Sequence, residues 1–173
     1  MAGEIRVVDY DPAWVAVFAQ IRARVDASLG DLADAIEHVG STAVPGLAAK
    51  PIIDIDVRLT AHTNLVDAIE RLEDIGYHHR GDLGIEGREA FDPPADLPDH
   101  HLYVCLPTAS EFQRHLAFRD FLRANPHIAT EYALLKKRLA VEFRQDRDGY
   151  TEAKGPFVEG VLRRSAEAIS KQR

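Results

Sequence analysis

Apolar residues recur at spacings of three and four near the amino end of the chain, and this pattern predicts an amphipathic helix. The recurring positions are Trp14, Phe18, Ile21, Val25 and Leu29. Asp11 can cap this helix, Pro12 suits its first turn, and Gly30 marks its end. We therefore expect the chain to open with a helix that buries one face.

A period of two then replaces this spacing and predicts short strands. We expect strands at residues 35–39, 52–59, 76–80, 85–91 and 101–106. A turn rich in glycine, serine and proline, residues 40–51, joins the first two strands, and a helix capped by Thr63 follows the second. From Ser110 onward helical spacing returns in three further helices, of which the last spans about residues 156–169.

These elements predict an α+β fold, with a small mixed β-sheet flanked by an N-terminal helix and a C-terminal group of helices. We expect one domain over residues 1–173, because this length supports a self-sufficient core and no repeat or linker divides the chain. The composition, 46% hydrophobic and 28% charged, is typical of a globular protein.

Charge and composition narrow the range of partners. The net charge of −7 disfavours extended nucleic-acid binding and adhesion to anionic membranes, because both depend on a basic surface. No apolar run is long enough to cross a bilayer, and no secretory signal is recognisable at the amino end. A single cysteine, Cys105, suits a reducing compartment, so we expect a cytoplasmic protein. Nothing in the residues determines an oligomeric state.

The strand at residues 52–59 carries paired acids. Side chains alternate along a strand, so Asp54 and Asp56 share one face while Ile53, Ile55, Val57 and Leu59 form the other. Carboxylates this close repel each other unless a cation lies between them, and hard divalent ions favour oxygen ligands. We therefore expect Asp54 and Asp56 to hold Mg²⁺ or another divalent metal. The alternative is a sheet face turned to water, where paired acids cost little.

The turn before this strand offers groups that suit a phosphate. Gly40, Ser41 and Thr42 follow a strand directly and supply backbone amides and two hydroxyls. A Gly-Ser turn followed by Asp-Ile-Asp on a strand resembles the signature of the nucleotidyltransferase superfamily. The resemblance implies that the turn grips nucleotide phosphates, and that Asp54 and Asp56 hold the magnesium ion and are catalytic.

A longer run resembles the hallmark of the GrpB family, and it reads IEHVGSTAVPGLAAKPIIDI at residues 36–55. Further segments that resemble this family are VVDYDPAW at 7–14, HHL at 100–102, FRDFLR at 118–123 and YTEAKGPF at 150–157. The resemblance covers most of the chain and implies a nucleotidyltransferase-like fold, without supplying a substrate. Members of this family also occur fused to dephospho-CoA kinase, which implies an accessory role there.

His101 is a further candidate ligand for a metal. Nucleotidyltransferases usually present a third carboxylate from a strand near the first pair. The strand at residues 101–106 contains no acid, so Asp99 or His101 would have to replace it. Alternatively, a neutral His101 imidazole binds a transition metal, or it bonds to nearby backbone at a loop boundary.

Cationic side chains supply candidate phosphate contacts. Lys50 precedes the acidic strand and Lys154 precedes the last helix, and each can act as a point charge. Arg119 lies inside an apolar helical stripe and needs an anion, either a ligand phosphate or an internal carboxylate. We place residues 136–138, a Lys-Lys-Arg run, on the outer face of their helix.

Three functions are consistent with these residues. The first is a metal-dependent nucleotidyltransferase that uses a nucleoside triphosphate and an unknown acceptor. The second is a non-catalytic accessory module that binds a nucleotide or another small phosphate-bearing ligand in the same cleft. The third is a hydrolase that uses a transition metal held by histidine.

Overall fold

A mixed β-sheet lies at the centre of the protein, in a computed structural model that describes residues 4–171. Its strands are β1 (Ala33–Val39), β2 (Ile53–Leu59), β3 (His78–Gly81), β4 (Arg88–Asp92) and β5 (His100–Cys105). They are arranged in the order β1-β2-β5-β4-β3. β2 and β5 are parallel, and the other neighbouring pairs are antiparallel. The predicted mixed sheet is confirmed.

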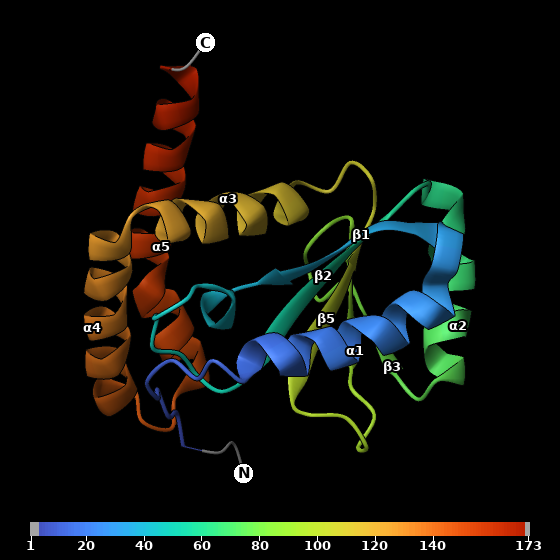
Figure 1. Cartoon of the computed structure of the whole chain (residues 1–173), viewed down its shortest axis with the longest axis horizontal. Helices are drawn as coiled ribbons and strands as arrows, with labels where there is room; N and C mark the ends of the chain where they lie inside the picture. The colour runs from blue at the N-terminus through green and yellow to red at the C-terminus, as the bar shows by residue number, and fades with distance from the viewer. Residues whose placement is uncertain (1–3, 172–173) are drawn as a thin grey trace.

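Helices cover both faces of this sheet and extend beyond one end of it (Figure 1). They are α1 (Trp14–Leu29), α2 (Leu65–Asp74), α3 (Ser110–Ala124), α4 (Pro126–Glu142) and α5 (Arg147–Ser170). α1 and α2 pack on one face, α3 lies across the other, and α4 and α5 stand beside the end at which β1 leads into β2. No helix of residues 4–171 is long and apolar enough to span a membrane.

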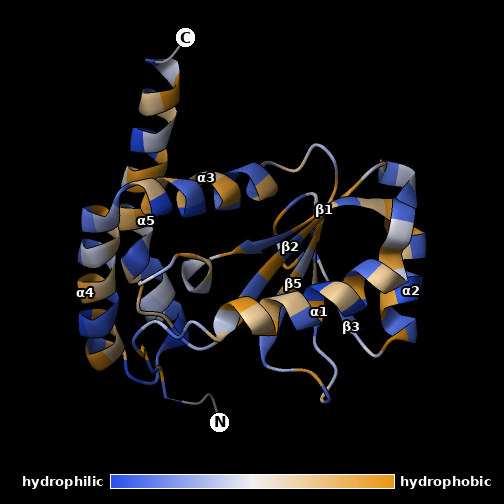
Figure 2. Ribbon diagram, in the orientation of Figure 1, coloured by the Kyte–Doolittle hydropathy of each residue, from blue (hydrophilic) through white to orange (hydrophobic). Residues whose placement is uncertain are grey.

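The main core lies between α1, α2 and the apolar face of the sheet. The alternating residues of β2 that were expected to be apolar and buried, Ile53, Ile55, Val57 and Leu59, are at most 2% exposed. They pack against Ile21, Val25 and Leu29 of α1, which are fully buried, and apolar colour runs through α1 and the central strands in Figure 2. Each such side chain stabilises the fold by about 1.5–3 kcal/mol when removed from water. This burial determines which face of β2 is left for the two aspartates.

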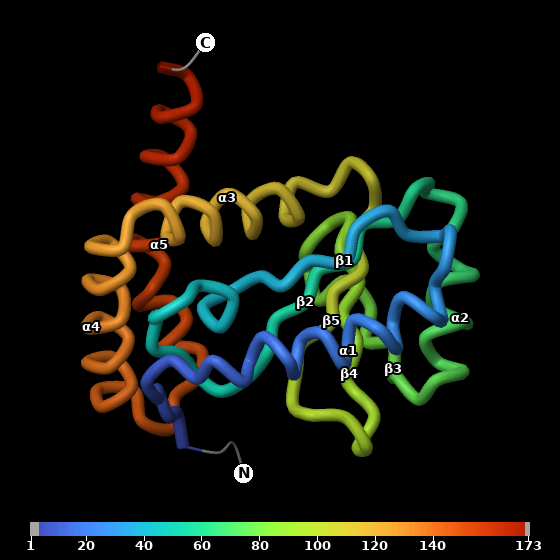
Figure 3. Tube along the Cα trace, in the orientation of Figure 1, coloured from blue at the N-terminus to red at the C-terminus, as the bar shows by residue number. Residues whose placement is uncertain are grey.

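A second apolar cluster fixes the turn between β1 and β2. Val44 and Leu47 of the turn pack against Leu122 of α3, Tyr132 of α4 and Val161 of α5. Figure 3 shows this segment held against the C-terminal helices. The helical group therefore positions the Gly-Ser turn above the sheet.

The last helix begins about two and a half turns earlier than the sequence predicts, at Arg147 instead of near residue 156. Asp146 caps it by accepting a hydrogen bond from the Gly149 amide at 2.9 Å. Tyr150, which is 1% exposed, anchors these first turns in a cluster with α4. Tertiary packing thus overrides the weak helix propensity of the glycines and of Pro156, which lies inside the helix.

Candidate functional site

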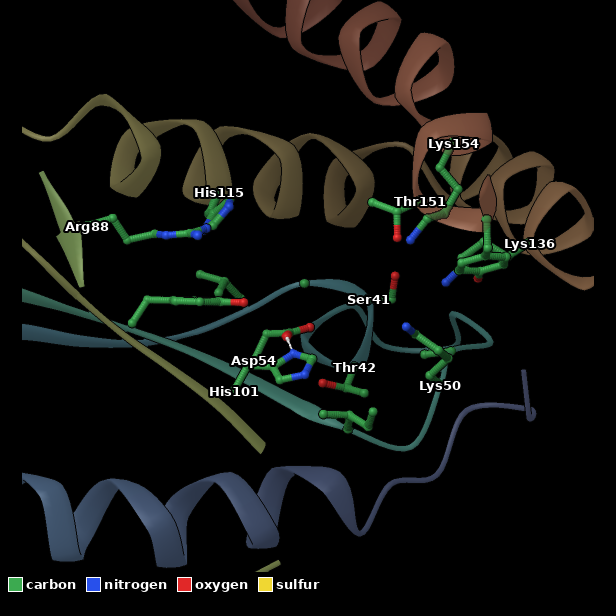
Figure 4. A pocket seen from close by; sticks show the side chains of 16 residues that line it. Ser41, Thr42, Lys50, Asp54, Arg88, His101, His115, Lys136, Thr151 and Lys154 are labelled. Carbon is green, nitrogen blue, oxygen red and sulfur yellow. Dashed lines mark hydrogen bonds and ion pairs between the residues drawn. The ribbon is translucent and has the colours of Figure 1, made fainter. Parts of the chain in front are cut away.

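A pocket of about 360 Å³ opens between the polar face of the sheet and helices α3, α4 and α5 (Figure 4). Seven of the nine site residues predicted from the sequence line it, namely Gly40, Ser41, Thr42, Lys50, Asp54, His101 and Lys154. The other two, Asp56 and Arg119, do not line the pocket. Residues far apart in the sequence therefore meet at one place, and the size suits a small ligand.

The Gly40 turn is shaped by its approach to Asp54. Gly40 has φ 71° and ψ −170°, a conformation that favours glycine. A Cβ atom built on Gly40 would lie 2.3 Å from Asp54 Oδ2, so the turn reaches the carboxylate only because residue 40 has no side chain. The Thr42 hydroxyl is buried and hydrogen-bonded to His38 Nε2 at 2.8 Å, whereas the Ser41 side chain points toward the pocket.

Two aspartate–histidine pairs lie on the polar face of the sheet. In the parallel pairing of β2 with β5, Asp54 is opposite His101, and Asp54 Oδ1 is 2.7 Å from His101 Nδ1. Asp56 Oδ2 is 2.6 Å from Nδ1 of His115, which comes from α3. The Asp54 side chain is 32% exposed and the Asp56 side chain is fully buried. Only the first carboxylate is open to a ligand.

The pKa values of both members of the Asp56–His115 pair are raised. Burial raises the pKa of Asp56, although the hydrogen bond from His115 opposes the shift. Burial lowers the pKa of His115, but the hydrogen bond and charge of Asp56, together with the charges of Glu111 and Asp54, outweigh it, and the net shift is upward. Asp56 Oδ1 is buried and has no hydrogen-bond partner among residues 4–171.

Three lysines from three different elements meet at the opposite end of the pocket. Lys50 follows the turn, Lys136 lies on α4 and Lys154 on α5. Burial, together with the charges of nearby lysines, lowers the pKa of Lys136 to about 7 and that of Lys154 to about 8. Burial also lowers the pKa of Lys50. Within residues 4–171, none of the three forms an ion pair with a carboxylate, although the charge of Asp54 acts on all of them.

Aromatic rings and one carbonyl partly offset these charges. The Lys154 Nζ lies 4.4 Å from the centroid of the Tyr150 ring, and the Lys50 Nζ lies 5.4 Å from it. Lys136 is 3% exposed, donates a hydrogen bond to the Ala48 carbonyl and sits 4.6 Å from the Tyr132 ring centroid. Such contacts are worth about 1–2 kcal/mol when desolvated, which is less than a paired anion would supply.

Arg119 is held by internal groups. Its Nη1 donates to Glu37 Oε2 at 2.6 Å and to the His38 carbonyl at 3.1 Å, and its Nε donates to Asp120 Oδ1 at 2.7 Å. These bonds tie α3 to β1 beside the pocket. A direct contact between Arg119 and a ligand stays a prediction.

Lys136 was missed by the sequence interpretation, which placed the run at 136–138 on the outer face of its helix. That placement is wrong for Lys136, which is buried in the pocket wall, and right for Lys137 and Arg138, which are exposed. A signal was present, because Lys136 follows Tyr132 by four residues and precedes Leu139 by three. Those two spacings put it inside the apolar stripe.

A closed protein site for a metal is absent from residues 4–171, where no three His, Cys, Asp or Glu side chains gather as ligands. Asp54 is the accessible carboxylate, while Asp56 is covered by His115. Mg²⁺ is commonly held by one or two carboxylates together with substrate phosphates. The donor set therefore fits a single divalent ion shared between Asp54 and a phosphate ligand.

Comparison with known protein families gives a match to the family described as GrpB protein over residues 4–164. The chain is 34% identical to the glutamate-rich protein GrpB of Alkalihalophilus pseudofirmus over 165 residues, which cover 92% of this chain and 95% of that protein. It is also 34% identical to the UPF0157 protein YqkA of Bacillus subtilis, over 90% of this chain. The chain spans only 45% of YqkA.

Solved structures show the same relationship. The crystal structure of the conserved protein GrpB from Enterococcus faecalis matches with a TM-score of 0.85 at 36% identity, covering 95% of this chain and 99% of that one. The structure of Cid1 in complex with its short product ApU matches with a TM-score of 0.51 at 15% identity, over 75% of this chain and 42% of that one. The second likeness shows the fold alone, which is that of nucleotidyltransferases.

A kinase is also among the relatives. A dephospho-CoA kinase of Mycolicibacterium paratuberculosis is 30% identical over 188 residues, which cover 93% of this chain and 46% of that protein. The similarity is therefore to a part of that kinase.

Proposed function

Because this chain belongs to the GrpB family and has a nucleotidyltransferase-like fold, we propose that it binds the phosphate groups of a nucleotide in the pocket above β2. The observation that carries the proposal is the cluster of Lys50, Lys136 and Lys154, which share one cavity and form no ion pair with any carboxylate of residues 4–171. Buried cations are costly unless an anion accompanies them. A ligand with several negative charges would supply that anion.

In this proposal, one phosphate group of the nucleotide contacts the three lysines, and the adjacent phosphate group lies near the Gly40 turn. The Ser41 hydroxyl and the backbone amides of the turn donate to it, and Lys50 and Lys154 supply point charges. The remaining space in a pocket of about 360 Å³ exceeds what one phosphate needs, which favours a larger molecule. That Cid1 was solved with ApU supports a nucleotide as the ligand class, by likeness of fold alone.

Mg²⁺ accompanies this ligand, held by Asp54 and by phosphate oxygens. When bound, the ion offsets phosphate charge and orients the phosphates for attack. The Asp54 carboxylate lies between the Gly40 turn and His101, and so faces both the phosphate region and the open pocket. Asp56 joins the metal only if its carboxylate becomes accessible from the pocket, because its side chain is fully buried.

Transfer of a nucleotidyl group to an acceptor is the finer form of this proposal. In it, Asp54 and Asp56 remain the catalytic carboxylates. Opposite them, β5 presents His101 and Tyr103, and no third carboxylate. A non-catalytic accessory module that binds the same ligand is the second candidate, and this incomplete acidic set favours it. The match to part of a dephospho-CoA kinase also supports a role as a module beside another domain.

Isothermal titration with each of the four nucleoside triphosphates, with and without Mg²⁺, tests the proposal. We expect at least one triphosphate to bind, and Lys154→Met to weaken it at least about tenfold, the effect of losing 1.4 kcal/mol. Lys137→Met is the matched control, because Lys137 is exposed and pairs with Asp9 away from the pocket. Absence of binding to all four by the folded protein would overturn the proposal.

A triphosphate radiolabelled at the α-phosphorus separates the two candidates, because nucleotidyl transfer bonds that phosphorus to the acceptor and releases pyrophosphate. If the label enters a product when cell extract supplies the acceptor, and Asp54→Asn abolishes that incorporation, transfer is established. If the ligand binds but no label is transferred under any condition, the accessory module is the correct reading.

A further inference from the structure

Arg88 lies at the start of β4 and turns its side chain onto the polar face of the sheet. It is 8% exposed and lines the pocket. Its Nε is fully buried without a hydrogen-bond partner, and within residues 4–171 its guanidinium forms no hydrogen bond or ion pair with another protein group. Arg88 is thus a buried cation in the pocket wall that interacts with the Asp56 carboxylate through charge but makes no direct hydrogen bond to it.

Arg119 shows how this fold otherwise treats a buried guanidinium. It is 9% exposed, close to the value for Arg88, yet it donates to two carboxylates and a backbone carbonyl. Within residues 4–171, Arg88 instead lies over the Tyr103 ring, whose centroid is 4.2 Å from its Cζ, and its charge also acts on Asp56. A cation–π contact satisfies none of the five N–H donors of arginine. Those donors are therefore available to a ligand.

The position of Arg88 separates it from the lysine cluster. Figure 4 shows Arg88 and His115 on one side of Asp54, and Lys50, Lys136 and Lys154 on the other. All of them line the same pocket, so the pocket has two cationic ends with a carboxylate between them. A single phosphate chain on the lysines leaves the Arg88 end unfilled.

We propose that Arg88, at the end of the pocket lined by His115 and Tyr103, forms a second anion subsite that binds a carboxylate or phosphate group of an acidic acceptor molecule. The planar fork of a guanidinium matches either group with two parallel hydrogen bonds. Asp54 then lies between the acceptor and the nucleotide phosphates. This subsite deepens the proposed function. The role of the bound molecule as acceptor rests on the proposed binding of a nucleotide, whereas the binding of an anion at Arg88 does not.

The direct test is the ¹⁵N–¹H signal of the Arg88 Nε group, which is protected from solvent exchange by its burial. The signal is assigned by its loss in Arg88→Gln. Inorganic phosphate and malonate are the probes, and we expect each that binds to shift the signal in a saturable manner. The probe with the lower Kd identifies the acceptor's group as a phosphate or a carboxylate.

Arg88→Lys keeps the charge and removes the fork, so we expect the Kd for the better probe to rise about tenfold. Arg88→Gln should abolish saturable binding of the probe, monitored by the Tyr103 and His115 signals. Thermal melts of both variants verify that they fold. No saturable shift of the Arg88 signal up to about 50 mM of either probe would overturn the subsite.

Lys154→Met distinguishes this result from the proposed function. If triphosphate fails to bind the native protein but malonate or phosphate still shifts Arg88, the nucleotide proposal fails and the subsite stands. If Lys154→Met also removes the shift of the Arg88 signal caused by malonate or phosphate, that probe binds at the lysine end of the pocket, and the separate subsite at Arg88 is refuted.

Discussion

The carboxylate of Asp54 fills the space that a side chain on Gly40 would need, since a Cβ on residue 40 would lie 2.3 Å from Asp54 Oδ2. The turn and the acidic strand are therefore fitted to each other. A phosphate on the turn and a metal on the strand can be neighbours only because this contact is so close.

Gly40→Ala should disturb both the turn and Asp54. Gly46→Ala is the matched control, because Gly46 also has positive φ, 81°, but nothing lies within 4 Å of its Cβ position. We expect Gly46→Ala to lower the free energy of unfolding by about 1–2 kcal/mol through backbone strain alone. Gly40→Ala should lose about 1–3 kcal/mol more through overpacking, and it should also lose triphosphate affinity. If urea melts and titrations show the same loss of stability and the same loss of affinity for Gly40→Ala as for Gly46→Ala, the contact is refuted.

Lys136→Met is expected to stabilise the free protein and to weaken ligand binding. The ammonium of Lys136 is desolvated, lies near two other lysines and has only a carbonyl as partner. Replacing it by an apolar side chain of similar length should raise the free energy of unfolding by about 1 kcal/mol, which corresponds to a rise of about 2–4 °C in Tm. Lys137→Met, one residue away and exposed, should change neither property appreciably. A lower Tm for Lys136→Met with unchanged affinity would show that Lys136 is structural.

The pH dependence follows from the same lysines. The pKa values of Lys136 and Lys154 lie at about 7 and about 8 in the folded protein, against 10.5 when solvated. Between pH 7 and 10 the unfolded chain therefore binds more protons, and these two groups make stability rise with pH. An anionic ligand favours the protonated lysines, so binding should take up about one proton at pH 8 and should weaken as pH rises toward 9. Titration calorimetry in buffers of different ionisation enthalpy measures the uptake. Release of protons on binding would contradict it.

The fold and the turn could be predicted because local patterns determine them. The period of two in residues 53–59 places Asp54 opposite a buried face, and the core confirms this directly. The run around Gly40 likewise identifies the family without any knowledge of packing. Both signals lie within one contiguous stretch of chain.

The rest of the site depends on contacts between distant segments. Arg88 and His115 come from β4 and α3, and no local spacing announces that they reach the pocket of Asp54. The early start of α5, which carries Lys154, depends on the burial of Tyr150 against α4. The buried state of Asp56 depends on His115, which is 59 residues away in the chain.

Arg119→Met should act on stability more than on binding. The guanidinium is buried and satisfied by Glu37 and Asp120, so its loss should cost about 2–3 kcal/mol. A double-mutant cycle with Glu37→Gln should give a coupling energy of about 1 kcal/mol. Because Arg119 does not line the pocket, the triphosphate Kd should change less than about threefold. A tenfold weaker Kd with little loss of stability would instead place the ligand against Arg119.

Magnesium dependence distinguishes the two aspartates. Asp54 is accessible and Asp56 is fully buried against His115. We expect Mg²⁺ alone to bind weakly, because no three protein ligands gather for it within residues 4–171. Its Kd should lie in the millimolar range, which corresponds to a binding free energy of about −4 kcal/mol. With triphosphate present, Mg²⁺ should tighten binding in the native protein.

Asp54→Asn should remove this effect of Mg²⁺ and should strengthen metal-free triphosphate binding, because one negative charge near the phosphates is lost. Asp56→Asn should keep the effect of Mg²⁺ and change mainly the melting temperature and the titration of His115, followed by NMR. If Asp56→Asn removes the dependence on Mg²⁺ as completely as Asp54→Asn does, the buried Asp56 carboxylate must become accessible when the ligand arrives. Asp56 would then be a metal ligand, the pair of carboxylates that transfer chemistry uses would be assembled by the ligand itself, and the accessory reading would lose its structural basis.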